Sequence, residues 1–145
     1  MTSAAVLMVE VLMVEDNRGD VVLVQEAAEQ VGLGYHVIMA RDGVEAMDFL
    51  RRQGQFSQAP RPDLIILDLK LPHKSGREVL AEVMADPSLR RIPLVIFSSS
   101  ESEMLLARSA KLPDECYKFK PGTYEGFLEL VRAIEAFRQK AVEGD

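Results

Sequence analysis

The sequence predicts an α/β domain in which helices cover both faces of a doubly wound, five-stranded parallel sheet. Three observations lead to this fold class. Short apolar runs alternate five times with longer segments of helical periodicity. Several of these runs are apolar without interruption, as in strands buried on both faces. The length of 145 residues suits one domain. Parallel strands joined by right-handed helical crossovers then suggest the strand order 2-1-3-4-5.

The first strand has to be chosen between two copies of the segment VLMVE, at residues 6–10 and 11–15. The copies are five residues apart, so the wrong choice would turn every side chain to the opposite face of the sheet. Only the second copy is followed by Asp16 and Asn17. We therefore place the first strand at residues 11–14.

The remaining elements follow from the same alternation. Apolar residues at three- and four-residue spacing indicate helices, and Gly or Pro marks several of their ends. The predicted helices are 18–31, 44–52, 76–84, 102–110 and 124–141. The predicted later strands are 35–39, 64–67, 94–97 and 115–119. The chain is then divided into an N-terminal extension (1–9), one domain (10–141) and a C-terminal tail (142–145).

Composition excludes several classes of function. The net charge of −6 argues against nucleic-acid binding, which needs a basic face. The apolar stretch 4–14 has no basic residues before it and is too short to span a bilayer, so we expect no membrane partner and a cytoplasmic protein. The single cysteine, Cys116, cannot form an internal disulfide and is expected in the core.

Reactive side chains stand at the ends of four predicted strands. Glu15 and Asp16 follow the first strand, Asp68 the third, Ser98 the fourth and Lys120 the fifth. Parallel strands bring their carboxyl ends to one edge of the sheet, so these groups should meet there. Three neighbouring carboxylates need a compensating cation, and oxygen ligands favour Mg²⁺.

This set of groups suits phosphoryl transfer. Asp68 could act as the nucleophile and form a carboxylate–phosphoryl anhydride. The metal and Lys120 would neutralise charge on the transferring group, and the hydroxyl of Ser98 could donate a hydrogen bond to it. Separately, Asp68 could be an ordinary loop acid, and Glu15, Asp16 and Asn17 could cap the first helix. Capping and metal binding are compatible.

Four motifs carry a resemblance to a known family: VLMVEDN, LIILDLKLP, LVIFSSS and CYKFKP. Through them the chain resembles the receiver domain of response regulators over about residues 10–140, which implies the flavodoxin-like receiver fold. Three longer stretches resemble more narrowly the stand-alone regulators paired with bacterial phytochrome kinases. They are ARDGVEAMDFLRRQGQF, RPDLIILDLKLPHKSGREVLAEV and SLRRIPLVIFSSS.

The resemblance implies roles for the acidic residues. Asp68 is expected to accept a phosphoryl group from a histidine kinase, possibly of the phytochrome type. Asp16 is expected to bind Mg²⁺ directly and Glu15 through water, with Asp68 and the backbone carbonyl of Lys70 as further ligands. Beyond Mg²⁺-dependent self-phosphorylation and autodephosphorylation, no enzyme activity is expected.

It also implies roles at the fourth and fifth strands. Ser98 and Tyr117 take the places of the switch hydroxyl and the switch aromatic residue, although Tyr117 could also be plain core. Lys120 is expected to contact the phosphoryl group. The Lys120–Pro121 peptide bond is expected to be cis, which is common only before proline.

One departure concerns hydrolysis of the phosphorylated state. In receivers, the side chains two positions after the phosphoacceptor and after the switch hydroxyl tune this reaction. Here they are Lys70 and Ser100, neither an acid nor an amide that would readily orient water. The hypothesis is a fairly long-lived phosphorylated state.

Apolar positions beyond the core suggest a partner surface. The last predicted helix carries a core stripe and a second, offset stripe of Leu130, Phe137 and Ala141. The preceding helix carries Met104, Leu105 and Leu106. Such extra apolar faces are usually buried against a partner. We expect a homodimer through the fourth helix, fifth strand and fifth helix. Because only 25 residues follow Lys120, output is expected through a protein partner.

Three other functions were compared with this one. A haloacid-dehalogenase-type phosphatase needs a second Asp two residues after its nucleophile, where this chain has Lys70. A flavin carrier cradles a phosphate in its first loop, where Glu15 and Asp16 would repel it. A pseudo-receiver, which binds partners without taking a phosphoryl group, is disfavoured because all five expected groups are present, but it stays the alternative.

Overall fold

The computed structural model describes residues 8–143 and contains one five-stranded parallel sheet in the order β2-β1-β3-β4-β5. The strands are β1 (Val9–Val14), β2 (Tyr35–Ala40), β3 (Leu64–Leu67), β4 (Leu94–Ser98) and β5 (Tyr117–Phe119). The predicted fold class and strand order are confirmed. Much of the predicted N-terminal extension and the end of the predicted tail lie outside the described residues, so those boundaries stay predictions.

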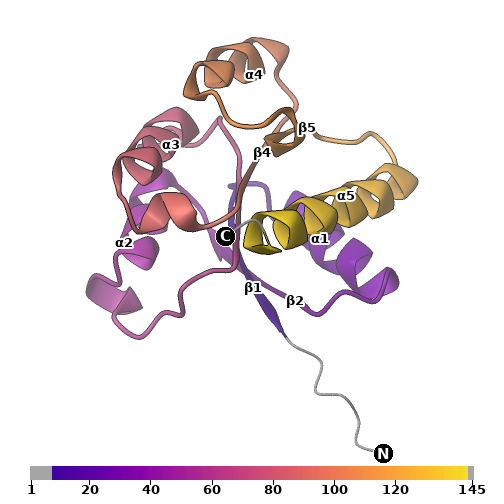
Figure 1. Ribbon diagram of the computed structural model, residues 1–145, viewed down its shortest axis with the longest axis horizontal. Coiled ribbons are helices and arrows are strands. Elements are labelled where there is room, and N and C mark those ends of the chain that lie inside the picture. The colour runs from indigo at the N-terminus through magenta and orange to yellow at the C-terminus, as the bar shows by residue number, and fades with distance from the viewer. Residues whose placement is uncertain (1–7, 144–145) are drawn as a thin grey trace, which may run out of the picture.

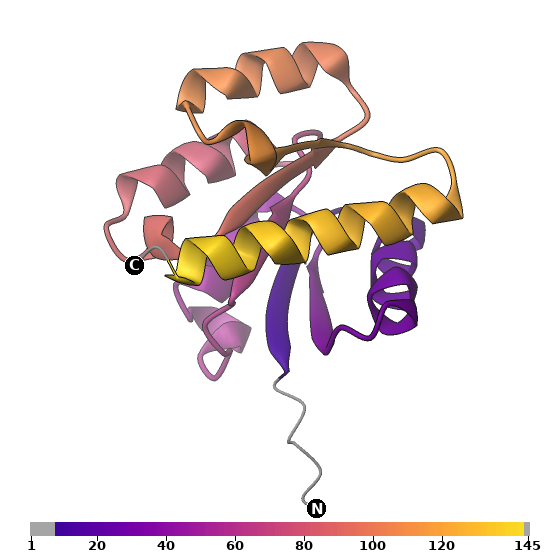
Figure 2. The ribbon, with the colours of Figure 1, turned by 45° about the vertical axis from the view of Figure 1, so that its right-hand side comes forward.

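Helices cover the sheet on both sides (Figure 1). They are α1 (Arg18–Gln30), α2 (Gly43–Leu50), α3 (Gly76–Ala85), α4 (Glu101–Ala107) and α5 (Tyr124–Glu143). Helices α1 and α5 pack together on one face, and Figure 2 shows α5 running across it. Helices α2, α3 and α4 contribute to the apolar core on the other face. None of the described helices is long and apolar enough to cross a membrane.

The central strands are apolar because both of their faces are covered. Along β1, Val11 and Met13 join the core under α1 and α5, whereas Leu12 and Val14 join the core on the opposite face. All four side chains are completely buried. The second VLMVE copy therefore forms the body of the strand, as predicted, and the end of the first copy extends it from Val9.

The five described α-helices begin with the same local device, a side chain that accepts a hydrogen bond from the backbone N–H three residues later. The capping residues are Asn17, Asp42, Ser75, Ser100 and Thr123. Each cap lies in the loop that follows a strand, so each helix turns back over the sheet from the edge where the strands end. The polar residues that begin these helices therefore gather at the carboxyl edge of the sheet.

Two predicted boundaries near the C-terminus were wrong. The fourth helix was expected to reach residue 110, but α4 ends at Ala107 and a 3₁₀ turn, Arg108–Ala110, follows. The fifth strand was expected from residue 115, but a 3₁₀ turn occupies Asp114–Cys116. There the N–H of Cys116 donates to the carbonyl of Pro113 at 2.9 Å. That bond uses the donor that a strand ladder would have required.

The apolar stripes of α5 differ in part from the expectation. Phe127, Val131 and Ile134 are buried in the core, as predicted. Leu130, assigned to a second, partner-facing stripe, is also buried within the domain, and Phe137 packs against both core clusters. The second stripe therefore mostly serves this chain's own core. The large apolar side chains that are exposed include Leu105 and Leu106 on α4 and Phe119 on β5.

A polar network inside the fold joins β2 to α5. The hydroxyl of Tyr35 donates to Glu135 Oε1 at 3.0 Å, and both residues are buried. Arg138 binds both oxygens of the same carboxylate, at 2.8 and 2.7 Å. These donors keep Glu135 ionised: burial alone would raise its pKa, but the hydrogen bonds from Arg138, Gln139 and Tyr35 lower it below its usual range.

Candidate functional site

The residues at the strand ends are fixed by the sheet itself. Glu15, Asp68 and Lys120 each lie just beyond the last residue of a strand. Their backbone N–H groups continue the pairing of the sheet, donating to the carbonyls of Ala40 (2.9 Å), Val14 (2.9 Å) and Ser98 (3.0 Å) in that order. The register of the strands therefore places these side chains at one edge, as the sequence predicted.

Glu15, Asp16 and Asp68 form an acidic cluster in which one oxygen of each lies within 4.8 Å of the others. Glu15 and Asp68 are buried, and Asp16 is exposed. Burial and the neighbouring charge of Asp68 raise the pKa of Glu15 well above its usual range, although Lys120 opposes this. Lys120 therefore compensates the acids only in part, and the cluster favours the binding of a proton or of a cation.

Glu15 supplies an observation that favours a bound cation. Its Oε1 accepts hydrogen bonds from the backbone N–H of Asn17 and from Lys120 Nζ, both at 3.2 Å. Its Oε2 is buried and accepts no hydrogen bond of good geometry from residues 8–143, although Lys120 Nζ lies 3.1 Å away. A buried acceptor without a donor is costly, and a hard divalent cation would satisfy it. The donor set of Glu15, Asp16 and Asp68 fits such an ion.

Lys120 is surrounded by acids. Its Nζ lies 2.8 Å from Asp20 Oδ2, 3.1 Å from Glu15 Oε2 and 3.4 Å from Asp68 Oδ2. Burial alone would lower the pKa of Lys120, but the hydrogen bond to Asp20 and the charges of Asp68 and Glu15 raise it above its usual range. Lys120 therefore remains an ammonium beside Asp68. The ring of Phe97 lies below it, with its centroid 5.3 Å from Nζ.

Asp20 and Gly76 belong to the site, but the sequence analysis did not assign either to it. Asp20 lies in the first turn of α1, where an acid is usual simply because it favours the helix N-terminus. Gly76, predicted only as a helix start, packs directly on the phosphoacceptor candidate. A Cβ on Gly76 would lie 2.1 Å from the backbone oxygen of Asp68. The sequence signal for this contact was a glycine eight residues after an Asp at a strand end.

Ser98 and Tyr117 are both turned inward. Ser98 ends β4 with its side chain buried, and its Oγ accepts from the N–H of Ser100 at 3.1 Å. Tyr117 is also buried. Its hydroxyl accepts from the N–H of Leu112 at 3.1 Å, and the guanidinium of Arg108 lies over its ring at 4.6 Å. The tyrosine hydroxyl thus bonds the segment that follows α4, not the acidic cluster.

The predictions for Lys70 and Pro121 have different outcomes. Lys70 donates its backbone N–H to Asp68 Oδ1 at 3.2 Å, which orients that carboxylate. The role of its carbonyl as a metal ligand stays a prediction. The cis bond expected before Pro121 is wrong, because no peptide bond is cis within residues 8–143. The backbone bond to Ser98 and the three acids already aim Lys120, so the ordinary preference for trans prevails.

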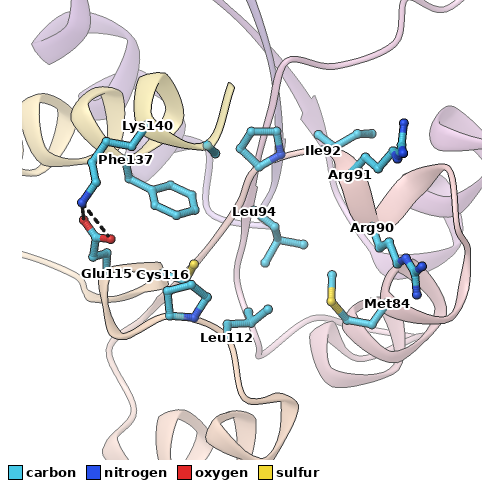
Figure 3. A pocket seen from close by; sticks show the side chains of 13 residues that line it. Met84, Arg90, Arg91, Ile92, Leu94, Leu112, Glu115, Cys116, Phe137 and Lys140 are labelled. Carbon is cyan, nitrogen blue, oxygen red and sulfur yellow. Dashed lines mark hydrogen bonds and ion pairs between the residues drawn. The ribbon is translucent and has the colours of Figure 1, made fainter. Parts of the chain in front are cut away.

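A hollow lies at the end of the sheet opposite the acidic cluster. It has a volume of about 560 Å³ and is lined by residues that include Leu94, Cys116 and Phe137 (Figure 3). Leu94 begins β4 and Cys116 precedes β5, so the hollow opens at the amino ends of the strands. Burial raises the pKa of the Cys116 thiol to about 11, which leaves it protonated and a poor nucleophile. Because the hollow lies at the amino ends of the strands and none of the acidic cluster lines it, it is separate from the acidic site.

Comparisons with known proteins agree with this geometry. Residues 11–132 match the family model for the response regulator receiver domain. Response regulator Rcp1 of Synechocystis sp. is 42% identical over 127 residues, which are 88% of this chain and 86% of that protein. The crystal structure of the phosphorylated cyanobacterial phytochrome response regulator RcpA is 41% identical, with a TM-score of 0.81 over 92% of this chain and 95% of that one. The Mn²⁺-bound form of Rcp1 is 40% identical, with a TM-score of 0.77 over 88% and 92%.

Proposed function

This chain belongs to the response regulator receiver domain family, and from that premise we propose that it takes a phosphoryl group from a histidine kinase onto Asp68. The observation that carries the proposal is the position of Asp68. It lies buried between acids that fit a divalent cation and an ammonium 3.4 Å from its Oδ2. Glu15 and Asp16 lie on the side of Asp68 where the cation would bind, and Lys120 lies on its other side.

In the proposed reaction, a carboxylate oxygen of Asp68 forms a bond to phosphorus while the bond from phosphorus to the kinase imidazole breaks. The imidazole nitrogen keeps the electron pair and takes up a proton. Lys120 neutralises charge that develops on the phosphoryl oxygens, and the hydroxyl of Ser98 donates a hydrogen bond to one of them. A bound Mg²⁺ would neutralise further negative charge. We expect autodephosphorylation by water, and no other enzyme activity.

Mg²⁺ is proposed as the ion because the available ligands are carboxylate and backbone oxygens, which suit a small hard cation. The Mn²⁺-bound structure of Rcp1 supports a divalent cation in a similar protein. Asp16 would bind it directly, Glu15 through water, and the carbonyl of Lys70 would add a ligand. A phytochrome-type kinase in the cytoplasm is the proposed donor, supported by the likeness to the phytochrome regulator RcpA.

Phosphorylation is proposed to act by population shift, favouring states in which Ser98 and Tyr117 are held inward. The output is proposed to be a protein contact, which includes a homodimer through α4, β5 and α5. The exposed Leu105, Leu106 and Phe119 support that surface, since they leave apolar area on α4 and β5 uncovered.

The deciding experiment is intact mass spectrometry after treatment with Mg²⁺ and acetyl phosphate. We expect wild type to gain one phosphoryl group and Asp68→Asn to gain none. Asp114→Asn is the matched control, because Asp114 is exposed and its only side-chain partner within the described residues is Arg108. Equal labelling of wild type and Asp68→Asn would refute the proposal. Absence of labelling in wild type would favour the pseudo-receiver.

The kinase class needs a second measurement. Phosphotransfer from a phytochrome-type histidine kinase should label this chain faster than transfer from an unrelated histidine kinase at the same concentration. Equal rates from the two kinases would refute the phytochrome assignment and leave the role of Asp68 intact.

A further inference from the structure

The ammonium of Lys120 does not have its shortest ionic contact with the phosphoacceptor candidate. That contact is to Asp20, at 2.8 Å, against 3.4 Å to Asp68. Asp20 comes from the first turn of α1, so it approaches Lys120 from an element outside the strand ends. The side chains of Asp20 and Lys120 are only 17% and 16% exposed, so solvent weakens their attraction little.

One ammonium is shared here among Asp20, Glu15 and Asp68. Any carboxylate that draws it closer releases the others from its charge. A divalent cation at the acidic cluster competes with Lys120 for the charge of Glu15 and Asp68, which the ammonium contacts at 3.1 and 3.4 Å. A phosphoryl group on Asp68 instead needs Lys120, which then has to turn toward that group. The position of Lys120 thus affects cation binding and phosphoryl binding at this site in opposite directions.

We propose that Asp20 is a positioning residue that holds Lys120 on the α1 side of the site until a phosphoryl group competes for it. The inference rests on the proposed function and deepens it by naming a regulator of the site. Asp20 keeps Asp68 and Glu15 available to the cation in the resting protein. After phosphorylation it competes with the phosphoryl oxygens for the same ammonium.

Opposite consequences follow for the two ligands. In Asp20→Asn, one negative charge is lost and Lys120, which already lies 3.1 Å from Glu15 and 3.4 Å from Asp68, is attracted more strongly to both, so the affinity for a divalent cation falls. Once the metal is saturating, Lys120 is no longer shared with Asp20, so it holds a phosphoryl group on Asp68 more tightly. A residue that only stabilised the start of α1 would not change the affinities for the cation and for the phosphoryl group in opposite directions.

The test measures both affinities in the unphosphorylated full chain. Mn²⁺ binding is followed by isothermal titration calorimetry, and binding of beryllofluoride, a phosphoryl mimic, is followed at saturating Mg²⁺. For Asp20→Asn we expect Mn²⁺ affinity to fall and mimic affinity to rise, each about three- to tenfold, the scale of one partly shielded charge. Asp20→Glu, which keeps a carboxylate in reach of Lys120, should recover part of both changes.

Glu29→Gln is the matched control, since it removes one negative charge from the same helix at an exposed position. It should leave both affinities within twofold of wild type. Parallel changes of the two affinities in Asp20→Asn, or no change in either, would overturn the role of Asp20. Wild type that binds Mn²⁺ but not the mimic would instead refute the proposed function, so the two failures are distinguishable.

Discussion

Gly76 offers a stringent test of how α3 supports the phosphoacceptor. In Gly76→Ala the new Cβ would lie 2.1 Å from the Asp68 carbonyl oxygen and 2.6 Å from the Cα of Leu69. Real Cβ contacts keep at least 3.0 Å, so the start of α3 and the residues after β3 must separate by about 0.9 Å. Both sides are backbone, so no flexible side chain can absorb the shift.

Overpacking of this kind costs about 1–3 kcal/mol, and the upper end applies here because backbone meets backbone. The hydrogen bond from the N–H of Gly76 to the carbonyl of Leu69, at 3.0 Å, should also stretch. We therefore expect urea denaturation to give a free energy of unfolding lower by about 2–3 kcal/mol. The affinity for Mg²⁺ should fall as well, because the loop that carries Asp68 is displaced.

Gly122→Ala is the matched control. A Cβ there meets nothing within 4 Å, and the backbone is not in the left-handed region. The change should be neutral or stabilise the protein by up to about 1 kcal/mol, because alanine restricts the unfolded chain. If Gly76→Ala unfolds at the same urea concentration as Gly122→Ala, the close packing of α3 on Asp68 is not what the structure indicates.

Three further outcomes follow from the polar groups. Tyr35→Phe removes a buried hydrogen bond to Glu135 and should lower the free energy of unfolding by about 1 kcal/mol in thermal or urea melts; an unchanged midpoint would contradict the network. Glu15 has a pKa raised from 4.5 to about 8, so the folded state binds its proton more tightly than the unfolded chain does. Without metal, the free energy of unfolding should therefore fall as the pH rises from 4.5 to about 8, and Mg²⁺ should restore it near neutral pH. Urea titrations across that pH range, with EDTA or with Mg²⁺, test this. A rise in metal-free stability with pH would count against it. Finally, Lys70 and Ser100 predict a phosphorylated state that outlasts seconds in a phosphate-release assay, and Lys70→Asn, which offers an amide to orient water, should shorten it.

The fold was predictable because its signals are local. Uninterrupted apolar runs such as residues 64–67 mark buried strands, and apolar residues at three- and four-residue spacing mark the helices between them. The site followed from topology alone, since parallel strands bring their ends together wherever they lie in the sequence. Glu15, Asp68 and Lys120 were found in this way.

The features that sequence reasoning missed depend on packing between elements. Asp20 was indistinguishable from an ordinary first-turn acid until the structure brought it to Lys120. The stripe containing Leu130 suggested an exposed face because periodicity cannot show how much of a helix surface the rest of the domain buries. The turn at Asp114–Cys116 was assigned in part to the strand because it joins the edge strand β5 directly, and three residues are too few for a periodicity that separates a turn from a strand.

The backbone bonds that hold Glu15, Asp68 and Lys120 to neighbouring strands have a consequence for folding. Each bond needs a correctly aligned strand beside it, so the pairings β1–β2, β1–β3 and β4–β5 must all exist before the three side chains face one another. Such long-range pairings close large loops and form late. A half-folded chain would thus lack the assembled site, and competence to receive a signal would coincide with completion of the sheet.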